Sequence, residues 1–123
     1  MIYTVFMEIL KCKDSPYLLD FKTEKTVKKY LPDKASLSPL ANLFAAVSDA
    51  ARLQILSALS ITDMCVTDLS AILGVNQTTL SHQLKSLRDA KLVNCIKQGK
   101  TVFYAISNKA VNDLMMTATA LSS

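Results

Sequence analysis

Apolar residues recur at intervals of three and four positions in four successive stretches between residues 36 and 90, which predicts four helices. In the first stretch, Ser36 or Ser38 can cap the helix, with Pro39 in its first turn. The apolar positions of this helix are Leu40, Leu43, Phe44 and Val47. Asp49 can cap the second helix. Its apolar face is formed by Leu53, Ile55, Leu56 and Leu59.

A short turn separates the next two helices. The third helix is expected to start between Asp63 and Thr67 and to end at Gly74, because glycine readily adopts the left-handed conformation that terminates helices. Its inward-facing residues are predicted to be Leu69, Ile72 and Leu73. Asn76 can cap the fourth helix, residues 77–90. That helix has an apolar stripe of Leu80, Leu84 and Leu87, and its opposite side carries Thr78, Ser81, His82 and Lys85.

Two strand-like stretches follow, residues 92–96 and 101–106, and Gly99 between them can supply the positive φ of a tight hairpin. Lys97 and Lys100 lie at the tip of this hairpin. A helix, a tight turn, a second helix with a polar outer face and a basic hairpin together form a winged helix-turn-helix. The predicted fold is therefore mainly α with a small β-hairpin.

The chain ends with a further amphipathic helix, which is expected to begin at Ser107 or Asn108. Its apolar face consists of Val111, Leu114, Met115, Ala118 and Leu121. A terminal amphipathic helix on so small a domain often packs against another subunit. We therefore expect a dimer.

Residues 1–35 carry weaker signals, and we interpret them as an N-terminal extension that is partly helical or flexible. Residues 36–123 are interpreted as the winged helix-turn-helix domain for DNA binding and dimerisation. The apolar segment 1–10 includes Glu8, lacks a cationic start and is too short to span a bilayer. The three cysteines are a poor disulfide framework. We expect a cytoplasmic protein with reduced thiols and no membrane partner.

Charge adds to this picture, because the net charge of +4 is confined to one part of the chain. Residues 1–76 carry eight basic and eight acidic side chains, whereas residues 77–123 carry six basic side chains and two acidic ones. The positive excess therefore lies on the fourth helix, the hairpin and the tail. A localised positive field of this kind is what a DNA-binding face needs.

The outer face of the fourth helix carries short hydrogen-bonding groups and a cation, which suit base edges and phosphates. An enzyme is not expected, because the chain has one histidine, no glycine-rich phosphate loop and no CxxC motif. A protein-interaction module that has lost DNA binding is an alternative, but such a module has no need for this polar face. Steeply salt-dependent binding to duplex DNA would separate the two.

Three segments resemble regulators of the arsenic-repressor/metallothionein-repressor (ArsR/SmtB) family: LANLFAAVSDAARLQILSAL, DMCVTDLSAILGVNQTTLSHQLKSLRDAKLV and IKQGKTVFYAI. The resemblance covers about residues 37–121. It implies a homodimer, joined through its first and last helices, that represses operons for metal export or sequestration. The repressor would bind a palindromic operator in double-stranded DNA and would be released by a metal or metalloid.

On the matching positions, the resemblance implies DNA contacts from the recognition helix, residues 77–90, and from the wing, residues 92–106. The residues concerned are Gln77, Thr78, Ser81, His82, Lys85, Lys97 and Lys100. His82 is the one histidine of the chain, and a metal site needs several converging ligands. We therefore interpret His82 as a DNA-contacting or exposed residue rather than as a metal ligand.

The family's metal sites are matched only in part. At the positions of a zinc-type site on the last helix, the chain has residues that do not bind metal, so this site is predicted to be absent: Asn108, Ala110 and Leu121. At the third helix, the family motif Cys-Val-Cys-Asp is here Cys65-Val66-Thr67-Asp68, which leaves one thiolate. A metal site would then combine Cys65 with Cys12 and could hold cadmium, lead, zinc or arsenite. Its third ligand would be Cys95, Asp63, Asp68 or water.

Two other interpretations stay open. Cysteine often packs as a small buried apolar residue, so the chain could be a ligand-independent repressor whose metal site has been lost. Alternatively it could be a redox-responsive repressor, in which a disulfide between Cys12 and Cys65 replaces the metal.

Overall fold

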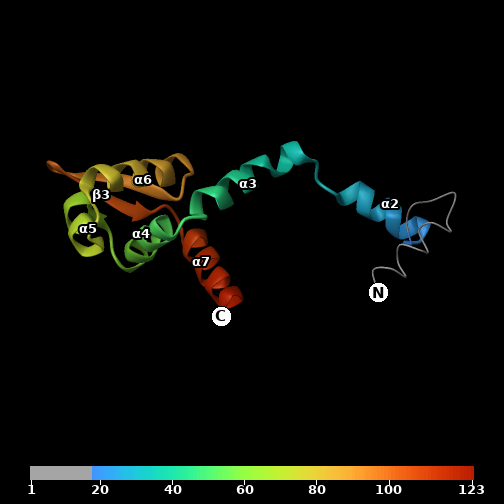
Figure 1. Cartoon of the computed structure of the whole chain (residues 1–123). Helices are drawn as coiled ribbons and strands as arrows, with labels where there is room; N and C mark the ends of the chain where they lie inside the picture. Colours follow the sequence, from blue (N-terminus) through green and yellow to red (C-terminus); the bar gives the residue numbers. More distant parts are fainter. Residues whose placement is uncertain (1–17) are drawn as a thin grey trace. The chain divides into compact units, whose positions relative to one another are not determined.

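The computed structural model describes residues 18–123 (Figure 1). The chain divides into two compact units, residues 1–37 and residues 38–123. Among the described residues of the first unit, one complete helix is present, α2, Phe21–Tyr30. The Asp20 carboxylate caps it by accepting a hydrogen bond from the Thr23 amide at 2.7 Å, and this hydrogen bond holds the pKa of Asp20 below its usual value. The Asp20 carboxyl group is therefore ionised when it caps the helix.

Helix α3, Lys34–Val47, begins earlier than its sequence predicts. The Asp33 carboxylate accepts a hydrogen bond from the Ser36 amide at 2.7 Å, so Asp33 supplies the cap that we expected from Ser36 or Ser38. That prediction was wrong, and Pro39 consequently lies inside the helix rather than in its first turn. Proline cannot donate the hydrogen bond of a helix interior, and it usually bends or weakens the helix at such a position.

Three further helices build the body of the second unit: α4 (Ala50–Ile61), α5 (Val66–Leu73) and α6 (Gln77–Asp89). Asp49 caps α4 through the Arg52 amide, and Asn76 caps α6 through the amides of Thr78 and Thr79, as predicted. Gly74 ends α5 with φ +64°, also as predicted. Ile72 was expected to face inward, but it is 68 % exposed, because Leu69 and Leu73 already occupy the inner side of this short helix.

A three-stranded antiparallel sheet follows the order β1-β3-β2, with β1 at Met64–Cys65, β2 at Val93–Gln98 and β3 at Thr101–Ile106. The hairpin β2–β3 was predicted, whereas β1 was not. Gln98 pairs with Thr101, which leaves a two-residue turn of Gly99 and Lys100. Positive φ at the first of these two residues is typical of a type II′ turn, and Gly99 supplies it at +63°.

Helix α6 is joined to the hairpin by a tight turn centred on Lys91. The Leu92 amide donates to the Leu87 carbonyl, and the Lys91 amide donates to the Arg88 carbonyl, which is the hydrogen-bond pattern of a Schellman motif. Lys91 has φ +63°, in the left-handed region that favours glycine. Three residues therefore separate the end of α6 from the start of β2, and the hydrogen bonds of this turn connect the two elements closely.

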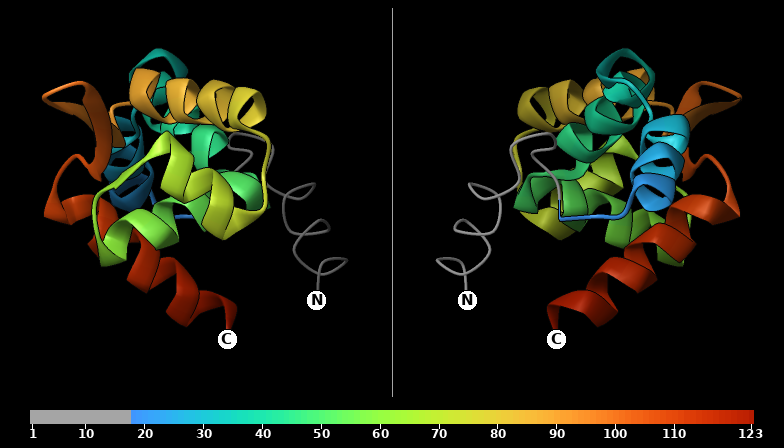
Figure 2. Two further views of the ribbon diagram at one scale, coloured as in Figure 1. Left: turned by 90° about the vertical axis from the view of Figure 1, so that its left-hand side faces the viewer. Right: turned by 90° about the vertical axis from the view of Figure 1, so that its right-hand side faces the viewer.

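The core of the second unit lies between α4, α5, α6 and the sheet. Leu69, Leu80, Leu84 and Leu87 have no exposed surface, which confirms the apolar stripe predicted for α6. The last helix, α7 (Lys109–Ser122), is capped by Asn108 through the Ala110 amide and buries Val111. Both views of Figure 2 place α6 and the hairpin on one side of this unit and α7 on the other.

Within residues 18–123, no single helix is long and apolar enough to cross a bilayer. The bent pair α3 and α4, whose axes meet at 87°, reaches that length and composition only when the two helices are taken together. In this structure α4 places Ile55, Leu56 and Leu59 in the core of the second unit.

Candidate nucleic-acid interface

Helices α5 and α6 are held in a fixed relation by the turn between them. The Val75 amide donates to the Ser70 carbonyl at 3.1 Å, and the Ser70 hydroxyl donates in return to the Val75 carbonyl. Asn76 then caps α6, so that its first turn, which includes Gln77 and Thr78, stands free at the surface. This is the arrangement by which a helix-turn-helix presents the N-terminal end of its second helix to a DNA groove.

The outer face of α6 carries polar side chains that the rest of the described chain does not use. All five residues predicted on this helix are exposed: Gln77, Thr78, Ser81, His82 and Lys85. Within residues 18–123 none of their side chains makes a hydrogen bond or an ion pair. Their donors and acceptors are therefore available to an external partner, while the buried leucines on the other side of the helix fix its orientation.

Sequence reasoning omitted Arg88 from this face. Ser81, Lys85 and Arg88 are spaced by four and three residues, so they follow one stripe along α6. Arg88 is exposed and lies in the last turn of the helix. The same spacing rule that selected Lys85 would have selected Arg88, and its guanidinium suits a phosphate group better than an ammonium does.

The hairpin carries the remaining two predicted residues. Lys97 lies in β2, and Lys100 is the second residue of the two-residue turn. Both are exposed, and the hairpin projects from the body of the unit beyond α5 and α6 (Figure 1). A projecting strand pair with cationic side chains near its tip fits a wing that contacts the DNA backbone. The outer face of α6 and the hairpin therefore both carry exposed cationic side chains.

The two described cysteines lie on opposite faces of the sheet. Cys65 pairs with Phe103, and Cys95 pairs with the next residue of the same strand, Tyr104. Because directly paired residues point to the same face and consecutive residues to opposite faces, the two thiols diverge. They also lie on strands that flank β3, about 10 Å apart, beyond the roughly 7 Å that a disulfide spans. Cys95 therefore cannot join Cys65 of the same chain as a ligand or a disulfide partner.

No metal centre is formed by the described residues alone. Among residues 18–123, no group of three or more His, Cys, Asp or Glu side chains lies close enough to hold a metal ion. The predicted site, Cys65 with Cys12 and a third ligand such as Asp63 or Asp68, includes a residue outside this part of the chain and stays a prediction. Cys65 itself is half-buried at the start of α5. Cys12, its expected partner, lies outside the described residues.

Cys95 instead forms a small polar cluster at the base of the hairpin. Burial raises the pKa of Tyr104, and the neighbouring Cys95 raises it further through a hydrogen bond and its charge, whereas Arg88 acts in the opposite direction. Tyr104 packs against the core of the unit. Arg88 of α6, Cys95 of β2 and Tyr104 of β3 therefore lie near one another at the base of the hairpin.

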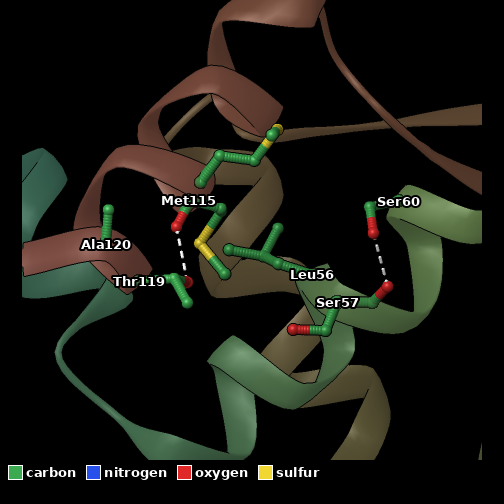
Figure 3. Close-up of a pocket in the computed structure, with 7 residues that line it drawn as sticks. Leu56, Ser57, Ser60, Met115, Thr119 and Ala120 are labelled. Carbon is green, nitrogen blue, oxygen red and sulfur yellow. Dashed lines mark hydrogen bonds between the residues drawn. The ribbon is translucent and has the colours of Figure 1, made fainter. Parts of the chain in front are cut away.

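A pocket of about 370 Å³ lies away from this surface, between α4 and α7. Figure 3 shows Leu56, Met115 and Ala120 lining it with their apolar groups. The hydroxyls that border the pocket already donate to carbonyls of their own helices, since Thr119 bonds the Met115 carbonyl and Ser60 bonds the Ser57 carbonyl. The pocket therefore offers an apolar surface with few free polar groups.

Comparison with known proteins identifies a family to which this chain is similar. Residues 49–94 match the family model described as "Bacterial regulatory protein, arsR family". The "Transcriptional repressor SmtB homolog" of Synechocystis sp. is 35 % identical over 91 residues, which are 72 % of this chain and 69 % of that protein. A "Cadmium resistance transcriptional regulatory protein CadC homolog" of Staphylococcus aureus is 32 % identical over 98 residues, 77 % of this chain and 81 % of that protein.

Among solved structures, a homodimeric winged helix-turn-helix DNA-binding domain of Mycobacterium bovis superposes with a TM-score of 0.69 at 28 % identity. The superposition covers 74 % of this chain and 86 % of that domain. The described fold is thus a winged helix-turn-helix in which α5 and α6 form the helix pair and β2–β3 forms the wing.

Proposed function

This chain belongs to the arsR family of bacterial regulatory proteins, and we propose that it is a transcriptional repressor that binds double-stranded operator DNA as a homodimer. The observation that carries the proposal is the surface of exposed, unpaired side chains on α6 beside the lysine-bearing wing. Family and fold are those of DNA-binding regulators rather than of enzymes. A protein that acts on operator DNA works in the cytoplasm of a bacterium.

In the proposed complex, the first turn of α6 enters the major groove. Gln77 and Thr78 lie at the end of the helix that reaches deepest, so they are placed to meet base edges. Ser81, His82 and Lys85 follow along the groove, and Arg88 is proposed to reach a phosphate. Lys97 and Lys100 of the wing contact phosphates or the adjacent minor groove. In such interfaces the phosphate contacts position the protein on the duplex, and the base contacts determine which sequence is bound.

The proposed dimer interface is the apolar surface of α3 and α7. Leu40 and Phe44 of α3 are about half exposed, at 51 % and 50 %. Met116 and Leu121 of α7 are 73 % and 83 % exposed. Burying such residues against a second copy removes apolar surface from water, which stabilises the dimer. A two-fold dimer would read two half-sites about one helical turn apart.

The function is tested by selection of duplexes from a random library, followed by titration of the enriched duplex at several salt concentrations. We expect an enriched sequence with two-fold symmetry and a log K that falls linearly with log salt. The double variant Lys97→Gln/Lys100→Gln should flatten that slope by about 0.9 for each phosphate that it no longer neutralises. Lys109→Gln on α7 is the matched control and should leave the slope unchanged. Absence of enrichment, with salt-independent binding, would instead favour a protein-interaction module.

Release by a soft metal or metalloid is a second candidate element of the function. Two observations favour it: Cys65 is half-buried at the start of α5, and a relative 32 % identical to this chain is named for cadmium resistance. The residues 18–123 do not complete a site, so the candidate depends on Cys12. Thiolates are the protein ligands that soft ions prefer.

The metal hypothesis predicts near-ultraviolet charge-transfer absorption when the reduced protein is titrated with cadmium, lead or arsenite. The bands should saturate at a fixed ratio per dimer and should disappear in Cys65→Ser and in Cys12→Ser, because either change removes a thiolate. Cys95→Ser is the control and should keep the bands, since Cys95 faces away from Cys65. Equal spectra in all variants would contradict metal sensing at Cys65, and redox control or ligand-independent repression would then take its place.

A further inference from the structure

Helix α2 carries a cationic surface outside the segment that matches the family model. The helix has the sequence FKTEKTVKKY, with four lysines and one glutamate. None of its residues is buried. We define the α2 lysine face as Lys22, Lys25, Lys28 and Lys29. The family match begins only at residue 49, and the proposed recognition surface makes no use of this face.

The lysines gather on one side of the helix. At 100° per residue, the four positions fall within an arc of about 120°, whereas Glu24 lies at its edge. Glu24 pairs with Lys28 at 3.0 Å, one turn further along the helix. Lys22, Lys25 and Lys29 make no ion pair within residues 18–123 and are exposed. A helix side that concentrates positive charge in this way complements a regular row of negative charges.

Local hydrogen bonds favour the helical conformation of this segment. Asp20 caps its start, the Leu31 amide donates to the Val27 carbonyl at its end, and the Thr26 hydroxyl donates to the Lys22 carbonyl. Lys28 and Lys29 lie in the last turn, where cations interact favourably with the helix dipole. The lysine face is thus already ordered before any partner binds, which lowers the entropic cost of association.

Aromatic rings lie beside the lysines. The Lys25 ammonium is 5.4 Å from the centre of the Phe21 ring, and the Lys29 ammonium is 5.4 Å from that of Tyr30. Phe21 lies within the lysine arc, and both rings are 72 % exposed. A membrane-surface helix separates its bulky apolar residues from its cations on opposite sides. On α2 this separation is incomplete, because Phe21 lies among the lysines while Val27 and Tyr30 lie outside their arc. A nucleic-acid backbone needs no continuous apolar face, so it fits this helix better than a lipid surface does.

We propose that the α2 lysine face is a second DNA-contacting surface, which binds backbone phosphates without regard to sequence. This proposal rests on the proposed function, since it adds a contact to the same repressor–DNA complex. The partner is duplex DNA outside the bases that α6 reads. Such contacts increase affinity and its dependence on salt, but they do not change which sequence is preferred.

The test compares full-length wild type with Lys22→Gln/Lys25→Gln/Lys29→Gln. Glutamine has a helix propensity close to that of lysine, so α2 should persist, and circular dichroism checks this. The matched control Lys22→Arg/Lys25→Arg/Lys29→Arg keeps the charge. Each protein is titrated between about 50 and 200 mM salt with three duplexes: the selected operator alone, the same operator with about 12 added base pairs on each side, and a random sequence of the longer length.

On both long duplexes, the affinity of wild type should fall about 40-fold more than that of the glutamine variant over this salt range, if the variant neutralises about three phosphates fewer. The arginine variant should behave as wild type. Equal salt slopes for wild type and the glutamine variant on the long duplexes would overturn the proposal.

The random duplex separates this proposal from the proposed function. If wild type bound the operator no more tightly than the random duplex, the proposed function of sequence-specific repression would fail. The salt slopes of wild type and the glutamine variant on the random duplex would still test the lysine face. Binding of wild type but not of the glutamine variant to vesicles of phosphatidylserine and phosphatidylcholine, together with equal slopes on DNA, would assign the face to a membrane and overturn the proposal.

Discussion

Replacing Leu84 by alanine should lower the free energy of unfolding by about 2–5 kcal/mol, the range for a leucine removed from a well-packed core. Leu84 has no exposed surface and lies in the middle of the apolar stripe of α6. The substitution removes buried apolar contacts and leaves a cavity between α6 and the rest of the core. A decrease of this size is a large share of the stability of a small domain, which is typically about 5–15 kcal/mol.

Urea denaturation followed by circular dichroism measures this decrease, at one protein concentration because a dimer's stability depends on it. Ile72→Ala is the control, since Ile72 is 68 % exposed on the neighbouring helix and its truncation should change stability by about 0.5 kcal/mol or less. Similar midpoints for wild type and Leu84→Ala would show that α6 is not held to the body by its leucine stripe.

The second large effect concerns DNA affinity. Ser81→Ala and His82→Ala should each weaken operator binding by about 1–3 kcal/mol, or roughly 5- to 150-fold, because each removes a hydrogen-bonding group from the exposed face of α6. Neither side chain makes a hydrogen bond within residues 18–123. Each variant should therefore have the same free energy of unfolding as wild type. Fluorescence anisotropy with the selected duplex at fixed salt measures the affinity.

Ser57→Ala provides a matched control for that measurement. Ser57 is also an exposed serine on a helix, but it lies on α4, and its hydroxyl donates to the Leu53 carbonyl of the same helix. Its replacement should leave operator affinity within about twofold of wild type. Wild-type affinity in a folded, dimeric Ser81→Ala or His82→Ala protein would remove that residue from the proposed set of contacts.

The parts of the fold that the sequence predicts are those governed by neighbouring residues. The caps at Asp49 and Asn76 form as expected, because each depends on side chains and amides two or three positions apart. The apolar stripe of α6 follows from helical periodicity alone. Exposure of the predicted contacts on that helix follows in turn, since whatever opposes a buried stripe must face outward.

The parts that were missed depend on distant residues or on competing local signals. Strand β1 has two residues, too few for any periodicity, and it exists because Met64 and Cys65 pair with Tyr104 and Phe103 of β3. The start of α3 was misplaced because Asp33 competes with two serines for the role of cap. Divergence of Cys65 from Cys95 depends on strand register, which the sequence did not specify.

The pairing of β1 with β3 also couples parts of the molecule mechanically. Cys65 ends β1 and immediately precedes α5, so the residue before the helix pair is paired with β3, the returning strand of the wing. At the C-terminal end of the helix pair, a short hydrogen-bonded turn at Lys91 joins α6 to β2. The helix pair and the wing are therefore connected at both ends, by strand pairing at Cys65 and by the turn at Lys91. A displacement of Cys65 would reach β3 of the wing directly through the paired strands.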